Sequence, residues 1–278
     1  MTKDILLAFD IGNTNIVVGV FRGKKLLTNW RLETDKYKSA DEYGMLLTQL
    51  FNYEQLDAHN VSDIIISTVV PSLTYTVQHM AGKYFGVKPI VVAAGIKTGL
   101  VVKYDNPKSL GSDRIVNAVA AHELYPGHLI VIDLGTATTI DAVSDKGEFL
   151  GGTIVPGIKV SSDALFERTA KLPKVELEAP GHVICRNTVE GIQAGVVYGN
   201  VGVIEFVVDR MKKEIVKITG NDSPVTVIAT GGMSSMMAQE TSCIDKVDKM
   251  LTLNGLQIIY EKNRNIRAAR QEEPCGFE

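Results

Sequence analysis

Runs of apolar residues alternate with polar breaks along this chain, and their lengths predict a mixed α/β fold. A first apolar run covers residues 5–9, a polar break follows at 10–15, and β-branched residues resume at 16–21. This pattern is typical of two strands joined by a tight turn. A third strand is expected at 25–33. The Ser-Ala-Asp-Glu sequence at 39–42 is a capping box, which predicts a helix to about Leu56.

The second half of the chain repeats this opening. An apolar run at 128–132 is broken at 133–138 and resumes at 139–143, and a third strand is expected at 148–153. The two breaks read Asp-Ile-Gly-Asn-Thr and Asp-Leu-Gly-Thr-Ala. We therefore predict two repeats of one β-β-β-α unit, packed face to face.

The same periodicities predict the remaining elements. Strands are expected at 64–70, 89–93 and 225–229, and helices at 71–85, 112–124, 157–171, 187–214 and 255–269. The helix at 187–214 carries an apolar stripe that fits either a subunit interface or packing within the monomer. Its members are Ile192, Val196, Val197, Val201, Ile204 and Val208.

Composition and charge narrow the class of protein. The 278 residues are 45% hydrophobic and 22% charged, with a formal net charge of -3, which argues against a chain built to bind nucleic acid. The longest uncharged stretch, 64–82, contains Pro71, Gln78 and His79, so it does not predict a membrane span. The N-terminus lacks the long apolar core of a secretory signal. We expect a soluble cytoplasmic protein without nucleic-acid or membrane partners.

Cysteine usage predicts neither a disulfide framework nor a metal site. The three cysteines are odd in number and far apart in the sequence. They are Cys185, Cys243 and Cys275.

Two Asp-x-Gly turns and one diglycine turn carry the candidate chemistry. Glycine permits close approach by a ligand, and successive backbone N–H groups in such a turn bind phosphate. Asp10 or Asp133 can hold a cation against phosphate oxygens, and the turns alone do not say which carboxylate holds which cation. Thr230-Gly231-Gly232 follows a strand, and it suits a base or ribose lying against backbone.

These three elements, in this order, resemble the superfamily of acetate and sugar kinases, heat-shock chaperone ATPases and actin. Narrower motifs, spread over nearly the whole chain, resemble type III pantothenate kinase. Ser112 stands where that family often has Ala, and Ala194 stands where Ser is common. The motifs are Asp10-Ile-Gly-Asn-Thr-Asn15, Val70-Pro71-Ser72, Tyr104-Asp-Asn-Pro107, Gly111-Ser-Asp-Arg114, Asp133-Leu-Gly-Thr-Ala-Thr138, Gly151-Gly-Thr-Ile-Val-Pro-Gly157, Asn187-Thr188 and Leu251-Thr-Leu-Asn-Gly-Leu256.

The resemblance implies two ribonuclease-H-like domains, as in actin-like ATPases, with a nucleotide cleft between them. We place these domains at residues 1–117 and 118–278. The implied activity is ATP-dependent phosphorylation of pantothenate to 4'-phosphopantothenate, the first step of coenzyme A synthesis, by a homodimer. Its implied cofactors are ATP with Mg²⁺ and a monovalent cation, K⁺ or NH₄⁺. A non-catalytic nucleotide-binding regulator and a kinase for another small hydroxy acid remain alternatives.

The resemblance also assigns roles to individual residues. Asp133 would hold the monovalent cation, and Asp10 would serve Mg²⁺. ATP would contact Asp10, Ile11, Gly12, Asn13, Thr14, Asn15, Ile16, Val17 and Thr136. Pantothenate would contact Tyr104, Gly111, Ser112, Asp113, Arg114 and Thr188.

The chemistry of these residue types agrees with those roles. The Arg114 fork can bind the pantothenate carboxylate, and Asp113 can align the acceptor hydroxyl and accept its proton. Structural roles are the alternatives. Asp113 and Arg114 could simply be first-turn residues of their helix. Tyr104 could be a packing residue at a strand end. Thr188 could be part of a helix cap beside Asn187.

Overall fold

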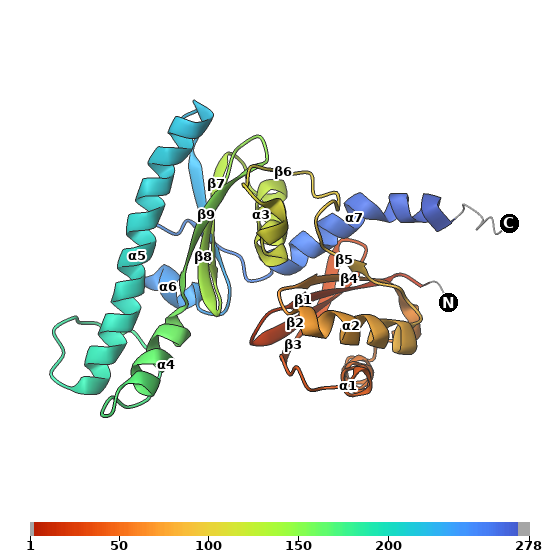
Figure 1. Ribbon diagram of the computed structural model, residues 1–278, viewed down its shortest axis with the longest axis horizontal. Helices are drawn as coiled ribbons and strands as arrows, with labels where there is room; N and C mark the ends of the chain where they lie inside the picture. Colours follow the sequence, from red (N-terminus) through yellow and green to blue (C-terminus); the bar gives the residue numbers. More distant parts are fainter. Residues whose placement is uncertain (1–2, 272–278) are drawn as a thin grey trace. The chain divides into compact units, whose positions relative to one another are not determined.

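The computed structural model describes residues 3–271, with side chains described as far as residue 264, and the chain forms two compact units (Figure 1). Unit 1 contains Met1–Gly99, Asn106–Ala120 and Thr252–Glu278, and unit 2 contains Leu100–Asp105 and Ala121–Leu251. This division differs from a single boundary after residue 117, because the last helix of the chain groups with unit 1.

Unit 1 is built on a five-stranded sheet in the order β3-β2-β1-β4-β5. β1 pairs antiparallel with β2 and parallel with β4, which places the carboxyl ends of β1 and β4 at the same edge. The strands are β1 (Ile5–Ile11), β2 (Asn15–Arg22), β3 (Lys25–Glu33), β4 (Val61–Thr68) and β5 (Ile90–Val91).

Two helices, α1 (Ala40–Tyr53) and α2 (Pro71–Met80), pack against this sheet in the core of unit 1. The unit also contains the start of α3 (Ser112–Leu124), α7 (Leu251–Gln271) and short helical turns at Ala58–Asn60, Ala81–Phe85 and Pro107–Ser109. The predicted capping box of α1 is confirmed: Glu42 N–H donates to the Ser39 hydroxyl, and Ser39 N–H donates to the Glu42 carboxylate.

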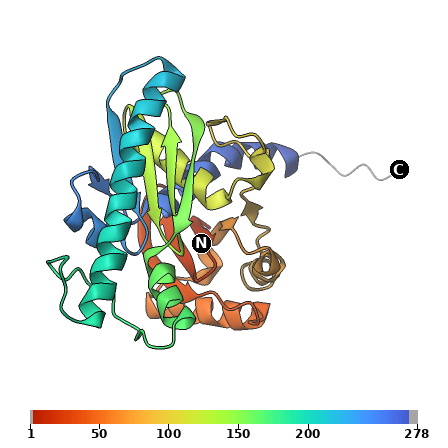
Figure 2. The ribbon, with the colours of Figure 1, turned by 60° about the vertical axis from the view of Figure 1, so that its left-hand side comes forward.

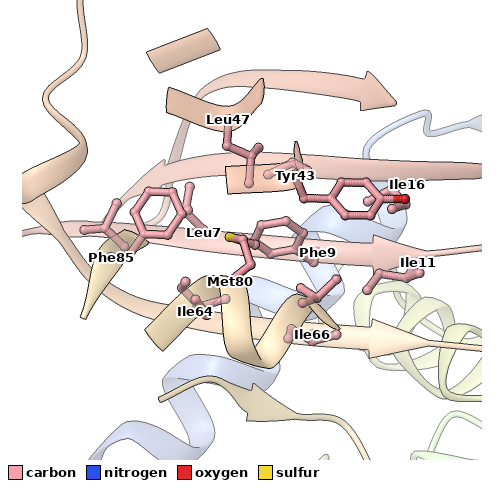
Figure 3. Close-up of a cluster of buried hydrophobic side chains, with 14 of the residues drawn as sticks. Leu7, Phe9, Ile11, Ile16, Tyr43, Leu47, Ile64, Ile66, Met80 and Phe85 are labelled. Carbon is pink, nitrogen blue, oxygen red and sulfur yellow. The ribbon is translucent and has the colours of Figure 1, made fainter. Parts of the chain in front are cut away.

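The core of unit 1 explains why the first apolar run is continuous. Alternate residues of β1, such as Leu7 and Phe9, pack with Ile64 of β4 against Tyr43 and Leu47 of α1 (Figure 3). The residues of β1 between them are buried as well. α7 is tied to the same unit by hydrogen bonds, because Tyr260 donates to Asp63 at 2.8 Å and Asn263 donates to the Lys97 carbonyl at 2.8 Å.

Unit 2 repeats the topology of unit 1. Its sheet has the order β11-β10-β7-β8-β9-β6, so β9-β8-β7-β10-β11 matches β3-β2-β1-β4-β5 strand for strand. The predicted repeat is confirmed, with β6 as an additional edge strand. The strands are β6 (Val101–Val102), β7 (His128–Leu134), β8 (Ala137–Val143), β9 (Glu148–Pro156), β10 (Val225–Thr230) and β11 (Lys246–Val247).

One face of this sheet is covered by α5 (Thr188–Thr219), with α4 (Ile158–Arg168) and α6 (Ser234–Glu240) beside it (Figures 1 and 2). All six residues of the predicted apolar stripe on α5 are buried, so packing within the unit accounts for the stripe. Among the described helices, α5 alone has the length and hydropathy of a membrane span, and 44% of its apolar window is buried inside the protein.

Candidate active site

The first Asp-x-Gly turn is a hairpin between β1 and β2 whose tip is braced by the residue that follows β3. Gly12 N–H donates to the Asn15 carbonyl at 3.0 Å. Thr34 donates its hydroxyl to the Gly12 carbonyl at 2.7 Å and its backbone N–H to the Thr14 carbonyl at 3.0 Å. A Cβ at Gly12 would lie 3.1 Å from the Asn15 carbonyl oxygen, so the tight turn favours glycine.

The side chains of this hairpin divide into buried and accessible positions. Ile11 and Ile16 belong to the hydrophobic core, so only their backbone can meet a nucleotide. The accessible or half-buried positions are Asp10, Gly12, Asn13, Thr14, Asn15 and Val17.

The start of α3 is fixed beside this hairpin, within unit 1. Ser67 of β4 lies opposite Asp10 of β1, and its hydroxyl is 2.9 Å from the Ser112 hydroxyl. Ser112 also accepts from Thr68 N–H and donates to the Thr68 carbonyl, both at 3.1 Å. These contacts use the full hydrogen-bonding capacity of the Ser112 hydroxyl, which leaves its backbone for any substrate contact.

Asp113 follows directly and has a perturbed carboxyl group. Burial raises its pKa above the ordinary value of 3.8, while the backbone N–H and the charge of Arg114 oppose that rise. The Arg114 N–H donates to Asp113 Oδ1 at 2.8 Å, and a Cβ at Gly111 would overlap the same oxygen. A helix N-terminus lowers the pKa of an Asp, whereas burial raises that of Asp113. A desolvated carboxyl of this kind is a candidate functional group.

Arg114 is buried, with 5% of its surface exposed, and the protein itself already engages it. Its position next to Asp113 in the first turn of α3 keeps the predicted base and the predicted carboxylate-binding residue together.

Tyr104 lies in unit 2, beyond the short strand β6. β6 pairs with β9, and Lys103 N–H continues that pairing by donating to the Phe149 carbonyl at 2.9 Å. The Tyr104 ring packs edge-to-face on Phe149 with centroids 6.2 Å apart. The ring therefore has a packing role, whatever its hydroxyl binds.

The second Asp-x-Gly turn is the equivalent hairpin of unit 2. Gly135 N–H donates to the Ala137 carbonyl at 3.2 Å, and Gly157 N–H donates to the Thr136 carbonyl at 3.1 Å. A Cβ at Gly157 would overlap the carbonyl oxygens of Gly135 and Thr136. The turn between β9 and α4 therefore closes directly on this hairpin, which explains a glycine that the motif alone left without a role.

The diglycine turn meets the same hairpin. β10 runs parallel to β7 with Thr230 opposite Asp133. Gly231 has a φ of +90°, and a Cβ there would lie 2.6 Å from the Leu134 carbonyl oxygen and 2.7 Å from Asp133 Oδ1. Asp133 and exposed Thr136 thus share one end of the sheet with the predicted adenosine turn.

Thr188 is the first residue of α5. Asn187 is the helix cap, accepting a hydrogen bond from Glu190 N–H at 2.9 Å, so the predicted capping role belongs to Asn187. Thr188 is exposed and lines an open groove of about 700 Å³ whose walls come from α4 and α5.

Comparisons with known proteins identify a family and a shared fold. Residues 6–210 match the sequence model of the family described as type III pantothenate kinase. A protein of Campylobacter jejuni described as a Baf family transcriptional activator superposes with a TM-score of 0.59 at 21% identity, covering 93% of this chain and 99% of that one.

Two further solved structures share the architecture. The ethanolamine utilization protein EutJ of Carboxydothermus hydrogenoformans gives a TM-score of 0.50 at 17% identity, covering 91% of this chain and 89% of that one. MreB 5 of Spiroplasma citri, solved with bound AMPPNP, gives a TM-score of 0.53 at 9% identity, covering 98% of this chain and 100% of that one. At such identities these likenesses show the fold alone, which is that of two ribonuclease-H-like domains as in actin-like ATPases.

Proposed function

Because the chain belongs to the type III pantothenate kinase family, we propose that it transfers the γ-phosphoryl group of ATP to the primary hydroxyl of pantothenate. Membership of the family makes the protein a kinase, and the acceptor is the proposed part. The observation that supports it most is the desolvated carboxyl of Asp113, fixed beside the first phosphate hairpin through Ser67 and Ser112.

Asp113 would act as the general base. As the acceptor oxygen bonds to the γ-phosphorus, the bond from that phosphorus to its bridging oxygen breaks, which releases ADP. The hydroxyl proton passes to the Asp113 carboxylate. The raised pKa makes this carboxylate a better proton acceptor than an ordinary one, and alignment of the hydroxyl lowers the entropic cost of the step.

Arg114 would bind the pantothenate carboxylate through its guanidinium fork. A guanidinium is weakly hydrated and matches a carboxylate with two parallel hydrogen bonds, so the buried Arg114 suits this role. Tyr104 and Thr188 are proposed as further contacts to pantothenate, as are the backbone groups at Gly111 and Ser112.

The two hairpins would hold ATP. A Cβ at Gly12 or Gly231 would meet backbone oxygens of the protein, so glycine allows the chain to turn tightly at both positions. Successive backbone N–H groups in such turns would bind the phosphates or the nucleoside. Thr136 would add a hydroxyl contact. Asp10 would hold Mg²⁺, which when bound neutralises the charge of the ATP phosphates. Asp133 would hold the monovalent cation, K⁺ or NH₄⁺.

A homodimer is part of the proposal, and the outward face of α5 is its candidate interface. Added Cβ atoms at four glycines along this helix would meet open space, so a second helix can approach closely. Phe206 is 63% exposed on the same helix, and Leu165 of α4 is 38% exposed in the wall of the groove that Thr188 lines. The glycines are Gly191, Gly195, Gly199 and Gly202.

Sedimentation velocity tests the dimer. Phe206→Glu should shift a dimeric parent to the monomer, because the charge would have to be buried in the interface. Tyr53→Glu is the matched control, since Tyr53 is 83% exposed at the end of α1 in unit 1. A monomeric parent, or an unchanged dimer in the Phe206 variant, would contradict this interface.

The activity itself is tested by ADP release with ATP, Mg²⁺ and pantothenate, with and without K⁺. We expect release that depends on pantothenate, in a cytoplasmic enzyme. A nucleotide-binding regulator would show no such dependence, and a kinase for a different hydroxy acid would release ADP only with that acid.

A further inference from the structure

The segment between α4 and α5 brings three metal-ligating side chains together at the start of α5. Residues 169–187 contain no helix or strand, and they carry His182 and Cys185. Glu190 lies in the first turn of α5. An imidazole nitrogen, the thiol sulfur and a carboxylate oxygen of these residues lie within 4.8 Å of one another.

The spacing of these atoms suits shared coordination better than mutual pairing. His182 Nε2 lies 3.5 Å from Glu190 Oε2, which is longer than a charge-assisted hydrogen bond of about 2.7–2.9 Å. When one zinc ion binds a nitrogen and an oxygen tetrahedrally, each at about 2.0–2.1 Å, those two atoms lie roughly 3.4 Å from each other. Cys185 Sγ makes only a 3.7 Å contact to the His182 carbonyl.

We propose that His182, Cys185 and Glu190 bind one Zn²⁺ ion, with water as the fourth ligand. Thiolate, imidazole and carboxylate are the ligands that zinc takes in proteins, whereas Mg²⁺ and Ca²⁺ prefer oxygen alone. The Cys185 thiol proton leaves to solvent as sulfur bonds the metal. One thiolate and one carboxylate then balance the charge of the ion.

Zinc at this position would fasten the 169–187 segment to α5. Two hydrogen bonds already join them: Gly181 N–H donates to the Tyr198 hydroxyl at 3.1 Å, and the Gln193 amide donates to the Glu176 carbonyl at 2.8 Å. The metal would add a stronger link between the end of the segment and the first helical turn. Its role would be structural. Because the proposed ligands flank Thr188, binding of the metal and kinase activity have to be measured separately.

Metal binding is tested by titrating zinc-free protein against a chromogenic chelator. The Cys243→Ser/Cys275→Ser variant leaves Cys185 as the single thiol and should still bind one zinc per chain. Loss of a group that only orients a ligand costs about 10–100-fold in affinity, so Cys185→Ser and Glu190→Gln should each cost about 100-fold or more. His59→Ala is the control, because His59 is an exposed histidine paired with Asp57.

Two spectroscopic measurements decide the role of the thiol. Co²⁺ should give a thiolate-to-metal charge-transfer band in the parent and none in the folded Cys185→Ser variant. Hydrogen exchange of the amides in 176–187 should slow on adding zinc to the parent and stay unchanged in the variant. Zinc binding that survives the Cys185 change, the absence of the cobalt band, or binding only at millimolar zinc would each overturn the proposal.

ADP release measured on the same zinc-free preparation separates the two proposals. Activity without zinc leaves the kinase proposal intact while the metal site is judged by binding alone.

Discussion

Replacing Asp113 by Asn tests the proposed mechanism at its centre. The change keeps the size of the side chain and an oxygen that can accept the Arg114 N–H, so the contact at 2.8 Å can survive. It removes the negative charge and the ability to take a proton. General-base contributions are typically about 10²–10⁴-fold, equivalent to about 3–5 kcal/mol of transition-state stabilisation, and kcat should fall by that factor.

The same change should not weaken the fold. Burial raises the folded-state pKa of Asp113, so its ionisation opposes folding at pH values above that pKa. The neutral Asn variant should therefore be at least as stable as the parent at pH 7. This advantage should vanish below pH 3.8, where the carboxyl is protonated in both folded and unfolded chains.

Three measurements on the parent and the Asn variant check these statements together: single-turnover kinetics, ATP titration calorimetry and urea unfolding at two pH values. In the parent, the acid limb of kcat/KM should lie above pH 3.8, because Asp113 must be ionised to act as a base. Turnover within about threefold of the parent would make Asp113 a helix-start residue only. A loss of ATP affinity in the Asn variant would instead place Asp113 among the residues that hold the cations bound with ATP.

Three further changes test the neighbouring assignments. Arg114→Lys should raise the pantothenate KM much more than the ATP KM, because only the acceptor loses a donor fork; equal effects in steady-state kinetics would place Arg114 elsewhere. Activity should be largely lost when Na⁺ replaces K⁺, and Asp133→Ala should be poorly active with either ion; equal turnover of the parent in both salts would remove the monovalent-cation role. Gly231→Ala should lower both ATP affinity and stability, because its Cβ would meet the Leu134 carbonyl at 2.6 Å and Asp133 Oδ1 at 2.7 Å. Gly220→Ala is the matched control, because Gly220 has a φ of +65° with open space around it. Urea unfolding of this control should show only the left-handed backbone penalty of about 1–2 kcal/mol, and calorimetry should show unchanged ATP binding.

Much of the fold could be predicted from local patterns. The apolar runs that open each unit are the strands β1 and β7, whose successive residues are nearly all buried, and the breaks after Asp10 and Asp133 are hairpin turns. The predicted strand at 25–33 and the predicted helix at 112–124 agree with β3 and α3 in their bounds. These elements are specified by neighbours in sequence, through turn glycines, caps and periodicity.

What the sequence could not show depends on distant partners. β6 and β11 are two-residue edge strands, defined by their pairing with β9 and β10 rather than by any pattern of their own. The sequence predicts a single boundary between two domains, so it does not show that α7 groups with unit 1. The desolvation of Asp113 depends on the residues packed around it, and no motif carries that information.

The sequence does not predict the candidate metal cluster for a similar reason. Cys185 is isolated from the other cysteines, so cysteine spacing gives no signal for a metal site. Its neighbours in space are His182 from the same segment and Glu190 from α5. The three side chains lie close together because α5 begins at Thr188, which places Glu190 in its first turn.

The discontinuity of unit 1 sets an order for folding during synthesis. Most of unit 2 is one continuous stretch, Ala121–Leu251, so it can fold as soon as that stretch leaves the ribosome. Unit 1 must wait for α7, whose Tyr260 and Asn263 bond to Asp63 and Lys97, residues made far earlier. Contacts over such separations are slow to form because a long loop must close first. The unit that carries the candidate base would therefore mature last, which would delay catalytic competence until α7 has been translated.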